Sequence, residues 1–192
     1  MAGVDPRLTA LIEERLKAKG RVILAIDGPC GAGKSTLGGL LHQHYKDSAL
    51  FHMDDFFLQP HQRTPERLVE PGGNVDRERF LSQVLRPLHK DNPFFYERFD
   101  CQTGSMTAIK AQPAALSIIE GVYSLHPSLR VHYDVKVFLD IGHDAQLNRI
   151  RQRVPEERFH HFITEWIPME RRYFQAFGVR VGCDLILSGS EV

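Results

Sequence analysis

A glycine-rich segment near the N-terminus carries residue types that suit the binding of phosphate groups. It reads Gly28-Pro29-Cys30-Gly31-Ala32-Gly33-Lys34-Ser35 and fits the pattern G-x-x-x-x-G-K-[ST]. The glycines let successive backbone N–H groups turn toward phosphate oxygens, and a helix N-terminus after the loop adds partial positive charge. Lys34 would reach the β- and γ-phosphates of a nucleotide, and the Ser35 hydroxyl would be a ligand of magnesium. The segment predicts a nucleotide-phosphate site, which Thr36 extends.

The segments on either side of this loop have the pattern that such a loop needs. Before it, the apolar run 22–26 ends in Asp27 and indicates a buried strand. After it, an apolar-periodic stretch to about Tyr45 indicates a helix. The alternative is a glycine-rich turn with an incidental lysine, which the agreement of strand, loop and helix disfavours. Asp27 is expected to stabilise the turn.

Two further carboxylates follow short apolar runs. The run 49–53 ends in Asp54-Asp55, and the run 115–119 ends in Glu120-Gly121. Ligands of open α/β sheets bind outside the carboxyl ends of the strands, where these acids would lie. One carboxylate could orient an acceptor hydroxyl and take its proton, and another could support magnesium. We therefore predict Asp54 as the base and Glu120 in the magnesium environment. A turn residue and a solvent-paired acid are the respective alternatives.

The order of these elements predicts an α/β fold. Short apolar runs recur with helical patterns between several of them, at 22–26, 49–53, 115–119, 135–139 and 185–187. Such alternation is typical of a mostly parallel sheet covered by helices. We expect a P-loop NTPase fold with about five parallel strands, helices on both faces and a short helical lid.

A single P-loop domain over 1–192 is expected, because this length is typical of one domain. Residues 1–20 predict an N-terminal helix, in which Asp5 and Pro6 suit the N-cap and first turn. Residues 54–113 are rich in Pro, Gly and aromatic residues around one helix near 77–88, and we interpret them as a long acceptor-binding insertion. Residues 143–178 would form the lid and the helices after it, with a break or kink at Pro168.

Composition and charge exclude several classes of protein. Apolar residues make up 42% of the chain and charged residues 25%, which is globular composition. Lys plus Arg and Asp plus Glu number 24 each, so no net charge attracts nucleic acid or a membrane surface. The three cysteines are far apart, no apolar run approaches the roughly 18 residues that span a bilayer, and the N-terminus lacks a signal-peptide core. A cytoplasmic location is expected, with no nucleic-acid or membrane partner.

The loop and the carboxylates resemble those of the uridine kinase-like branch of P-loop kinases, which includes relatives acting on nicotinamide riboside, pantothenate and ribulose phosphate. The resemblance runs from about Arg21 to the C-terminus. The family's Asp-then-aromatic segment is matched by 54–57, where the nicotinamide riboside kinase version looks especially close, and its Glu-Gly pair by Glu120-Gly121. The resemblance implies ATP and Mg²⁺ as cofactors, Asp54 as catalytic base and Phe57 near the substrate.

Other positions bear on the acceptor. The family has an Asn-aromatic-Asp segment whose aspartate holds ribose hydroxyls, and Asn74-Val75-Asp76 resembles it. Asp76 would then hold a sugar diol, although an Asp directly before a helix is also a preferred N-cap. Tyr96 and Arg98 could line the acceptor pocket, or they could belong to an ordered surface loop. Uridine is one candidate acceptor among several, because Val75 and Cys101 stand where the family has other residues.

The lid carries two arginines that could meet the transferring phosphate. The segment 146–153 resembles the family's arginine-bearing lid helix, and Arg149 and Arg153 are four residues apart, as on one helical face. The resemblance implies a catalytic role for Arg149 and nucleotide contacts for Arg153. A solvated basic face is the alternative, because apolar residues already explain the helix.

Together these features predict an ATP-dependent kinase that phosphorylates a hydroxyl of a nucleoside-like small molecule. The alternatives are a kinase for a non-nucleoside alcohol such as pantothenate, and an ATP-binding regulatory switch without kinase activity. Guanine specificity is disfavoured because no Asn-Lys-x-Asp segment occurs. The sequence does not determine the oligomeric state, and a homo-oligomer is one of the alternatives.

Overall fold

The computed structural model describes residues 3–189 and has a five-stranded sheet at its centre. The strand order is β2-β5-β1-β6-β7, and every neighbouring pair is parallel. The strands are β1 (Val22–Asp27), β2 (Ser48–His52), β5 (Leu116–Glu120), β6 (Val135–Asp140) and β7 (Leu185–Ser188). The predicted α/β fold with about five parallel strands is therefore confirmed.

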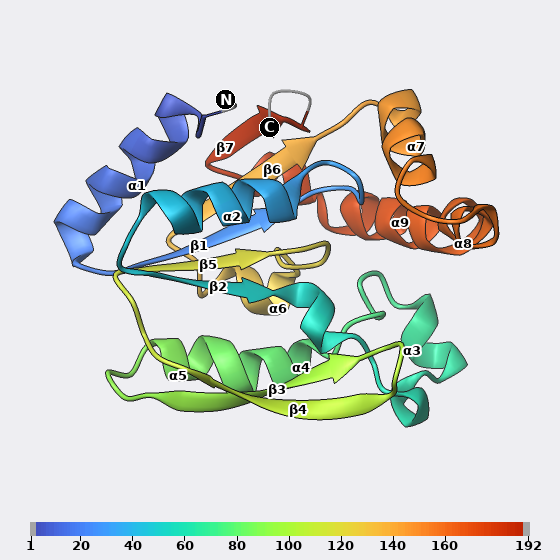
Figure 1. Ribbon diagram of the computed structural model, residues 1–192, viewed down its shortest axis with the longest axis horizontal. Helices are drawn as coiled ribbons and strands as arrows, with labels where there is room; N and C mark the ends of the chain where they lie inside the picture. The colour runs from blue at the N-terminus through green and yellow to red at the C-terminus, as the bar shows by residue number, and fades with distance from the viewer. Residues whose placement is uncertain (1–2, 190–192) are drawn as a thin grey trace.

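Helices cover both faces of this sheet. Successive side chains of a strand point to opposite faces, so the apolar strands present side chains to both layers of helices. Leu24 and Ile26 of β1 pack with α1 (Pro6–Lys19) and α2 (Lys34–His44), which lie together on one face (Figure 1). Ile23 and Ala25 belong to the second apolar cluster, with residues of α6 (Pro127–Arg130) and α9 (Ile167–Phe177). The sheet is thus buried on both faces, as continuous apolar strands require.

Helix α1 begins and ends at well-defined caps. The side chain of Asp5 accepts a hydrogen bond from the backbone N–H of Arg7, and Pro6 occupies the first turn. Gly20 ends the helix in the left-handed conformation. Leu8 and Ile12 are fully buried against the sheet, so the helix is stabilised by packing as well as by its caps.

The segment 54–113 contains more regular structure than the sequence indicated. The expected helix is present as α4 (Arg77–Phe80), the π-helical turn η3 (Leu81–Leu85) and α5 (Arg86–Leu88). It is followed by an unpredicted antiparallel hairpin of β3 (Phe94–Asp100) and β4 (Ser105–Ala111), which lies beside the helix in Figure 1. The sequence pattern did not predict this hairpin, in which aromatic residues of β3 pack on the helix and on β2. The shorter elements are η1 (Met53–Phe56), η2 (Pro60–Gln62) and α3 (Pro65–Val69).

The C-terminal helices gather at one end of the sheet (Figure 1). They are α7 (His143–Arg151), α8 (Glu156–His161), the π-helical turn η4 (Phe162–Trp166) and α9, followed by η5 (Val179–Gly182). Pro168 does not break the chain of helices, because it lies in the first turn of α9, where a missing N–H is tolerated. The irregularity falls before it, in the π turn. Within residues 3–189 no helix has the length and apolar character needed to cross a bilayer.

Candidate active site

The phosphate loop joins β1 to α2, as its sequence predicts. Gly28 has φ +142°, and a Cβ atom there would lie 2.2 Å from the backbone oxygen of Leu139, so only glycine fits. The Lys34 side chain turns back over the loop, where its Nζ donates hydrogen bonds to the carbonyl oxygens of Gly28 at 2.8 Å and Pro29 at 2.9 Å. The ammonium is thereby held inside the loop, beside the N-terminus of α2.

Asp27 secures the start of the loop. Its fully buried carboxylate accepts hydrogen bonds from the backbone N–H groups of Gly28 at 2.7 Å and Leu125 at 2.9 Å, and from the Tyr173 hydroxyl at 2.7 Å. Burial raises the pKa of Asp27 to about 6, although these donors act to lower it. This agrees with the expectation that Asp27 stabilises the turn.

Ser35 and Glu120 meet at the carboxyl end of the sheet. The Ser35 hydroxyl lies 3.1 Å from each carboxylate oxygen of Glu120, the buried last residue of β5. His52, the register partner of Glu120 in β2, places its Nδ1 2.5 Å from Oε1, and this hydrogen bond raises the pKa of His52. Hydroxyl and carboxylate oxygens are ligands that magnesium prefers, so this pair fits the predicted ion. Within residues 3–189 no group of three or more His, Cys, Asp or Glu side chains could hold a metal by itself.

Asp54 lies in η1, directly after β2. Its side chain is open to solvent on one side, but surrounding protein atoms desolvate the carboxyl group and raise its pKa. The charge of Glu120 raises this pKa further, while Lys34 and His52 lower it. Asp54 therefore shares one electrostatic environment with the loop lysine and with Glu120, although the three come from different parts of the chain.

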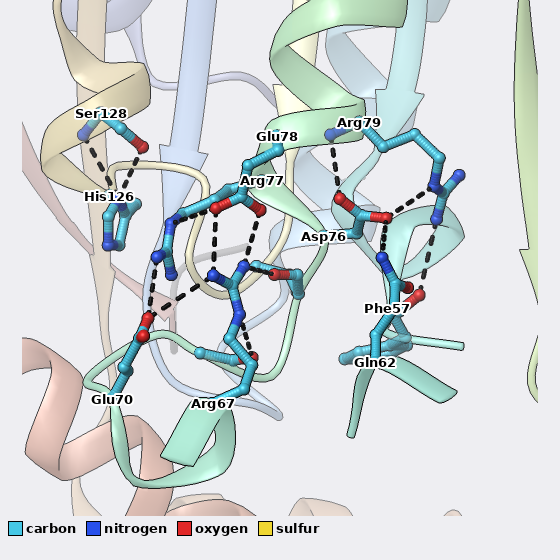
Figure 2. A network of polar contacts seen from close by, with 12 residues as sticks. Phe57, Gln62, Arg67, Glu70, Asp76, Arg77, Glu78, Arg79, His126 and Ser128 are labelled. Carbon is cyan, nitrogen blue, oxygen red and sulfur yellow. Dashed lines mark hydrogen bonds and ion pairs between the residues drawn. The ribbon is translucent and has the colours of Figure 1, made fainter. Parts of the chain in front are cut away.

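Asp76 is the N-cap of α4, and its carboxylate already accepts several hydrogen bonds (Figure 2). It accepts hydrogen bonds from the backbone N–H of Arg79 at 2.9 Å, from the Arg79 Nε at 3.3 Å and from the Gln62 amide at 2.8 Å. The buried Arg79 guanidinium also lies over the Phe56 ring, 4.5 Å from its centroid. The capping role is thus present, and the carboxylate has few free lone pairs.

The three other residues predicted near the substrate differ in exposure. Tyr96 is only 7% exposed, and its ring packs on Phe56 with centroids 5.7 Å apart, so it forms part of the core. Phe57 is half-buried and forms an isolated antiparallel bridge with Val75. Arg98 is exposed on β3, where its charge is one of those that lower the pKa of Asp55.

The two lid arginines lie in different settings. Arg149 on α7 donates a hydrogen bond from Nη1 to the carbonyl oxygen of Gly31, at 3.1 Å, so it contacts the phosphate loop directly. Helix α7 ends at Arg151, and Arg153 is an exposed residue in the turn that follows. The expectation that both arginines share one helical face was wrong, because the helix ends two residues too early.

Two further side chains contact the loop and were not predicted. Glu170 on α9 accepts a hydrogen bond from the Cys30 N–H, and Gln146 on α7 donates one to the Cys30 carbonyl oxygen. Both side chains are buried. A sequence signal existed for Glu170, because it occupies the apolar stripe of α9 between Ile167 and Tyr173, where a charged residue is unusual.

The curated proteins similar to this chain include several uridine kinases. One from Bacillus mycoides is 28% identical over 148 residues, covering 71% of this chain and 68% of that protein. One from Geobacillus kaustophilus is 25% identical over 170 residues, covering 81% and 79%. The solved structure of a possible uridine kinase from Bacillus stearothermophilus has a TM-score of 0.69 and 22% identity, covering 94% of this chain and 99% of that one. No protein-family model matches the chain.

The parallel sheet, with a phosphate loop between β1 and α2, is a P-loop NTPase fold. The similarity to curated uridine kinases identifies the chain as a P-loop kinase, a phosphotransferase with a hydroxyl group as acceptor. Within this class the chain is uridine kinase-like, because the curated relatives that it matches over most of its length are uridine kinases. The resemblance inferred from the residues of the loop and the strand ends is confirmed.

Proposed function

We propose that this protein transfers the γ-phosphate of ATP to a hydroxyl group of a nucleoside-like small molecule. The observation that carries the proposal is the convergence of Asp54, Glu120 and Lys34 at the carboxyl end of the sheet. Burial raises the pKa of Asp54, and the charges of Glu120 and Lys34 act on this pKa in opposite directions. A P-loop that only bound a nucleotide would not need a carboxyl group with a raised pKa at the place where an acceptor would enter.

In this mechanism Asp54 orients the acceptor hydroxyl and accepts its proton as the oxygen attacks the γ-phosphorus in line. The bond between the γ-phosphorus and the β,γ-bridging oxygen breaks, and ADP leaves. Lys34 leaves the carbonyl oxygens of Gly28 and Pro29 and donates to the phosphate oxygens, which are stronger acceptors. Arg149, already on the loop, is near enough to offset charge on the transferring group.

Ser35 and Glu120 are the residues that would hold magnesium. When bound, the ion would offset the negative charge of the phosphate oxygens. Magnesium usually takes only one or two protein oxygens and completes its shell with phosphate and water, which suits this small set of ligands. His52 would keep the Glu120 carboxylate oriented through the bond to Oε1. Residues 28–36, most of them through main-chain N–H groups, and Arg153 remain the predicted nucleotide contacts.

Recognition of the acceptor is assigned to Asp76, Phe57 and Arg98. The Asp76 carboxylate accepts three hydrogen bonds, and two carboxylate oxygens offer about four lone-pair positions. One sugar hydroxyl could therefore bind directly, and a second could replace the Gln62 amide, which comes from a short surface turn. Tyr96 would act through the position of Phe56, because its own ring is buried.

The test is an acceptor screen with purified protein and magnesium-ATP. Uridine, cytidine, nicotinamide riboside, pantothenate and related alcohols are each supplied, and acceptor-dependent ADP is measured by a coupled assay. We expect at least one nucleoside or riboside to give ADP together with a new phosphate ester detected by phosphorus NMR. Turnover with pantothenate alone would assign the non-nucleoside alternative. ATP binding without turnover of any acceptor would overturn the proposal in favour of a nucleotide-dependent switch.

A further inference from the structure

A buried carboxylate from the C-terminal helices lies against the phosphate loop. Glu170, 140 residues along the chain from Cys30, is 5% exposed, and its Oε2 accepts a hydrogen bond from the Cys30 backbone N–H at 3.0 Å. Burying a carboxylate is unfavourable unless hydrogen bonds and nearby charges offset the loss of water. An apolar side chain would fill this position in α9 at lower cost, so packing alone does not explain the presence of Glu170.

A second buried side chain holds the other side of the same residue. Gln146 of α7 is 4% exposed, and its Nε2 lies 3.1 Å from the carbonyl oxygen of Cys30 and 3.3 Å from its Sγ. Two successive peptide groups of the loop, on either side of the Cys30 Cα, are therefore bound by side chains from two different helices. Glu170 supplies an acceptor for the Cys30 N–H, and Gln146 supplies a donor for the Cys30 carbonyl oxygen.

The loop needs such an external support. Gly28, Gly31 and Gly33 all have positive φ, so its shape depends on residues with wide conformational freedom. A flexible loop must be ordered when a ligand binds, and ordering it beforehand raises the affinity. We propose that Glu170, together with Gln146, is a positioning residue that fixes Cys30, so that the following backbone N–H groups face the nucleotide phosphates. This inference rests on the proposed function in taking the loop to hold those phosphates.

The charge of Glu170 gives this role a measurable signature. Burial raises the pKa of Glu170 to about 7, with Asp27 of β1 acting in the same direction and Lys34 of α2 opposing it. The other titratable groups that face it are the Cys30 thiol of the loop and the Tyr123 hydroxyl of the segment after β5. Phosphate anions entering the loop act in the same direction as Asp27. ATP binding near neutral pH should therefore draw a proton onto Glu170.

The experiment measures ATP binding by calorimetry, without an acceptor, for the full-length protein and three variants. Glu170→Leu removes the acceptor of the Cys30 N–H and should weaken ATP binding about tenfold, the effect expected for one buried hydrogen bond. Glu170→Gln keeps an amide oxygen at the same place and should bind within about threefold of wild type. Glu165→Gln is the matched control, because Glu165 is exposed on the preceding turn and its ion-pair partner within residues 3–189 is His161.

Proton uptake on ATP binding is measured by repeating the calorimetric titrations at pH 7 in buffers of different ionisation enthalpy. Wild type and Glu165→Gln should take up part of a proton, and Glu170→Gln should take up measurably less. Proton uptake by Glu170→Gln equal to that of wild type overturns the role of Glu170, even if Glu170→Leu fails to fold. ATP binding by a folded Glu170→Leu variant as tight as in wild type also overturns it. A wild-type protein that binds ATP but phosphorylates no acceptor overturns the proposed function alone.

Discussion

Replacing Tyr173 by phenylalanine should destabilise the protein, whereas the same change at Tyr133 should not. Both rings are buried, at 0% and 6% exposure, and each substitution removes only the hydroxyl oxygen and keeps the ring. The Tyr173 hydroxyl donates a 2.7 Å hydrogen bond to the buried Asp27 carboxylate, while the Tyr133 hydroxyl has no hydrogen-bond partner among residues 3–189. The pair therefore isolates the contribution of one hydrogen bond to a charged group.

The expected loss for Tyr173→Phe is about 2 kcal/mol in the free energy of unfolding, the range for a hydrogen bond to a buried charge. In a chain of this size that corresponds to a decrease in Tm of about 4–8 °C. Tyr133→Phe should stay within about 0.5 kcal/mol of wild type, or gain slightly, because it removes a buried hydroxyl without a partner. Urea unfolding followed by circular dichroism measures both values.

The effect of Tyr173→Phe should also depend on pH. The hydrogen bond favours the ionised form of Asp27 and lowers its pKa, which lies at about 6 in the folded protein, so its removal raises that pKa further. The loss of stability is then largest above pH 7, where Asp27 is ionised, and smaller near pH 5, where the carboxyl is protonated. Equal losses for the two variants, or a difference independent of pH, would refute the assignment.

Four further substitutions test other parts of the protein. Gly28→Ala should destabilise by about 2–4 kcal/mol through the clash with the backbone of β6 and the positive φ. Gly39→Ala, in the interior of α2 with open space around it, should stabilise by about 0.5–1 kcal/mol in the same urea assay. Asp54→Asn should lower kcat by about 10²–10⁴-fold with little change in ATP affinity; a similar loss of both would contradict its role as base. Arg79→Met should cost about 3 kcal/mol, because the buried Asp76 loses its ion-pair partner; a loss below about 1 kcal/mol in urea unfolding would count against that pairing.

Local patterns were sufficient for the sheet and the phosphate loop. Each buried strand is a short apolar run, and the loop sequence follows such a run and precedes a helix, so neighbouring residues carry the information. The hairpin of β3 and β4 was missed because its alternation is weak. Tyr96 and Phe99 are buried three residues apart, and β3 is stabilised by contacts with η1 and η3. Such contacts are not visible in a local pattern.

The end of α7 illustrates a different limit. The periodicity of 146–153 suits a helix to its last residue, but the chain turns after Arg151 and leads into α8 at Glu156. Helix ends depend on capping and on the path to the next element, so their positions are the least certain part of a sequence pattern. Arg149 therefore meets the loop, while Arg153 remains exposed beyond the helix.

By itself, the sequence predicted the class of this protein. The loop from Gly28 to Ser35 indicates a nucleotide-phosphate site through backbone and side-chain chemistry at fixed local spacing, and the acids that end two strands are the basis of the kinase prediction. Only the tertiary structure brought Glu170 and Gln146 onto Cys30, and His52 onto Glu120. These pairs are 68 to 140 residues apart in the chain, and their meeting depends on strand order and helix packing. Asp27 and Glu170 acquire their raised pKa values only there, because desolvation depends on the atoms that the complete fold places around them.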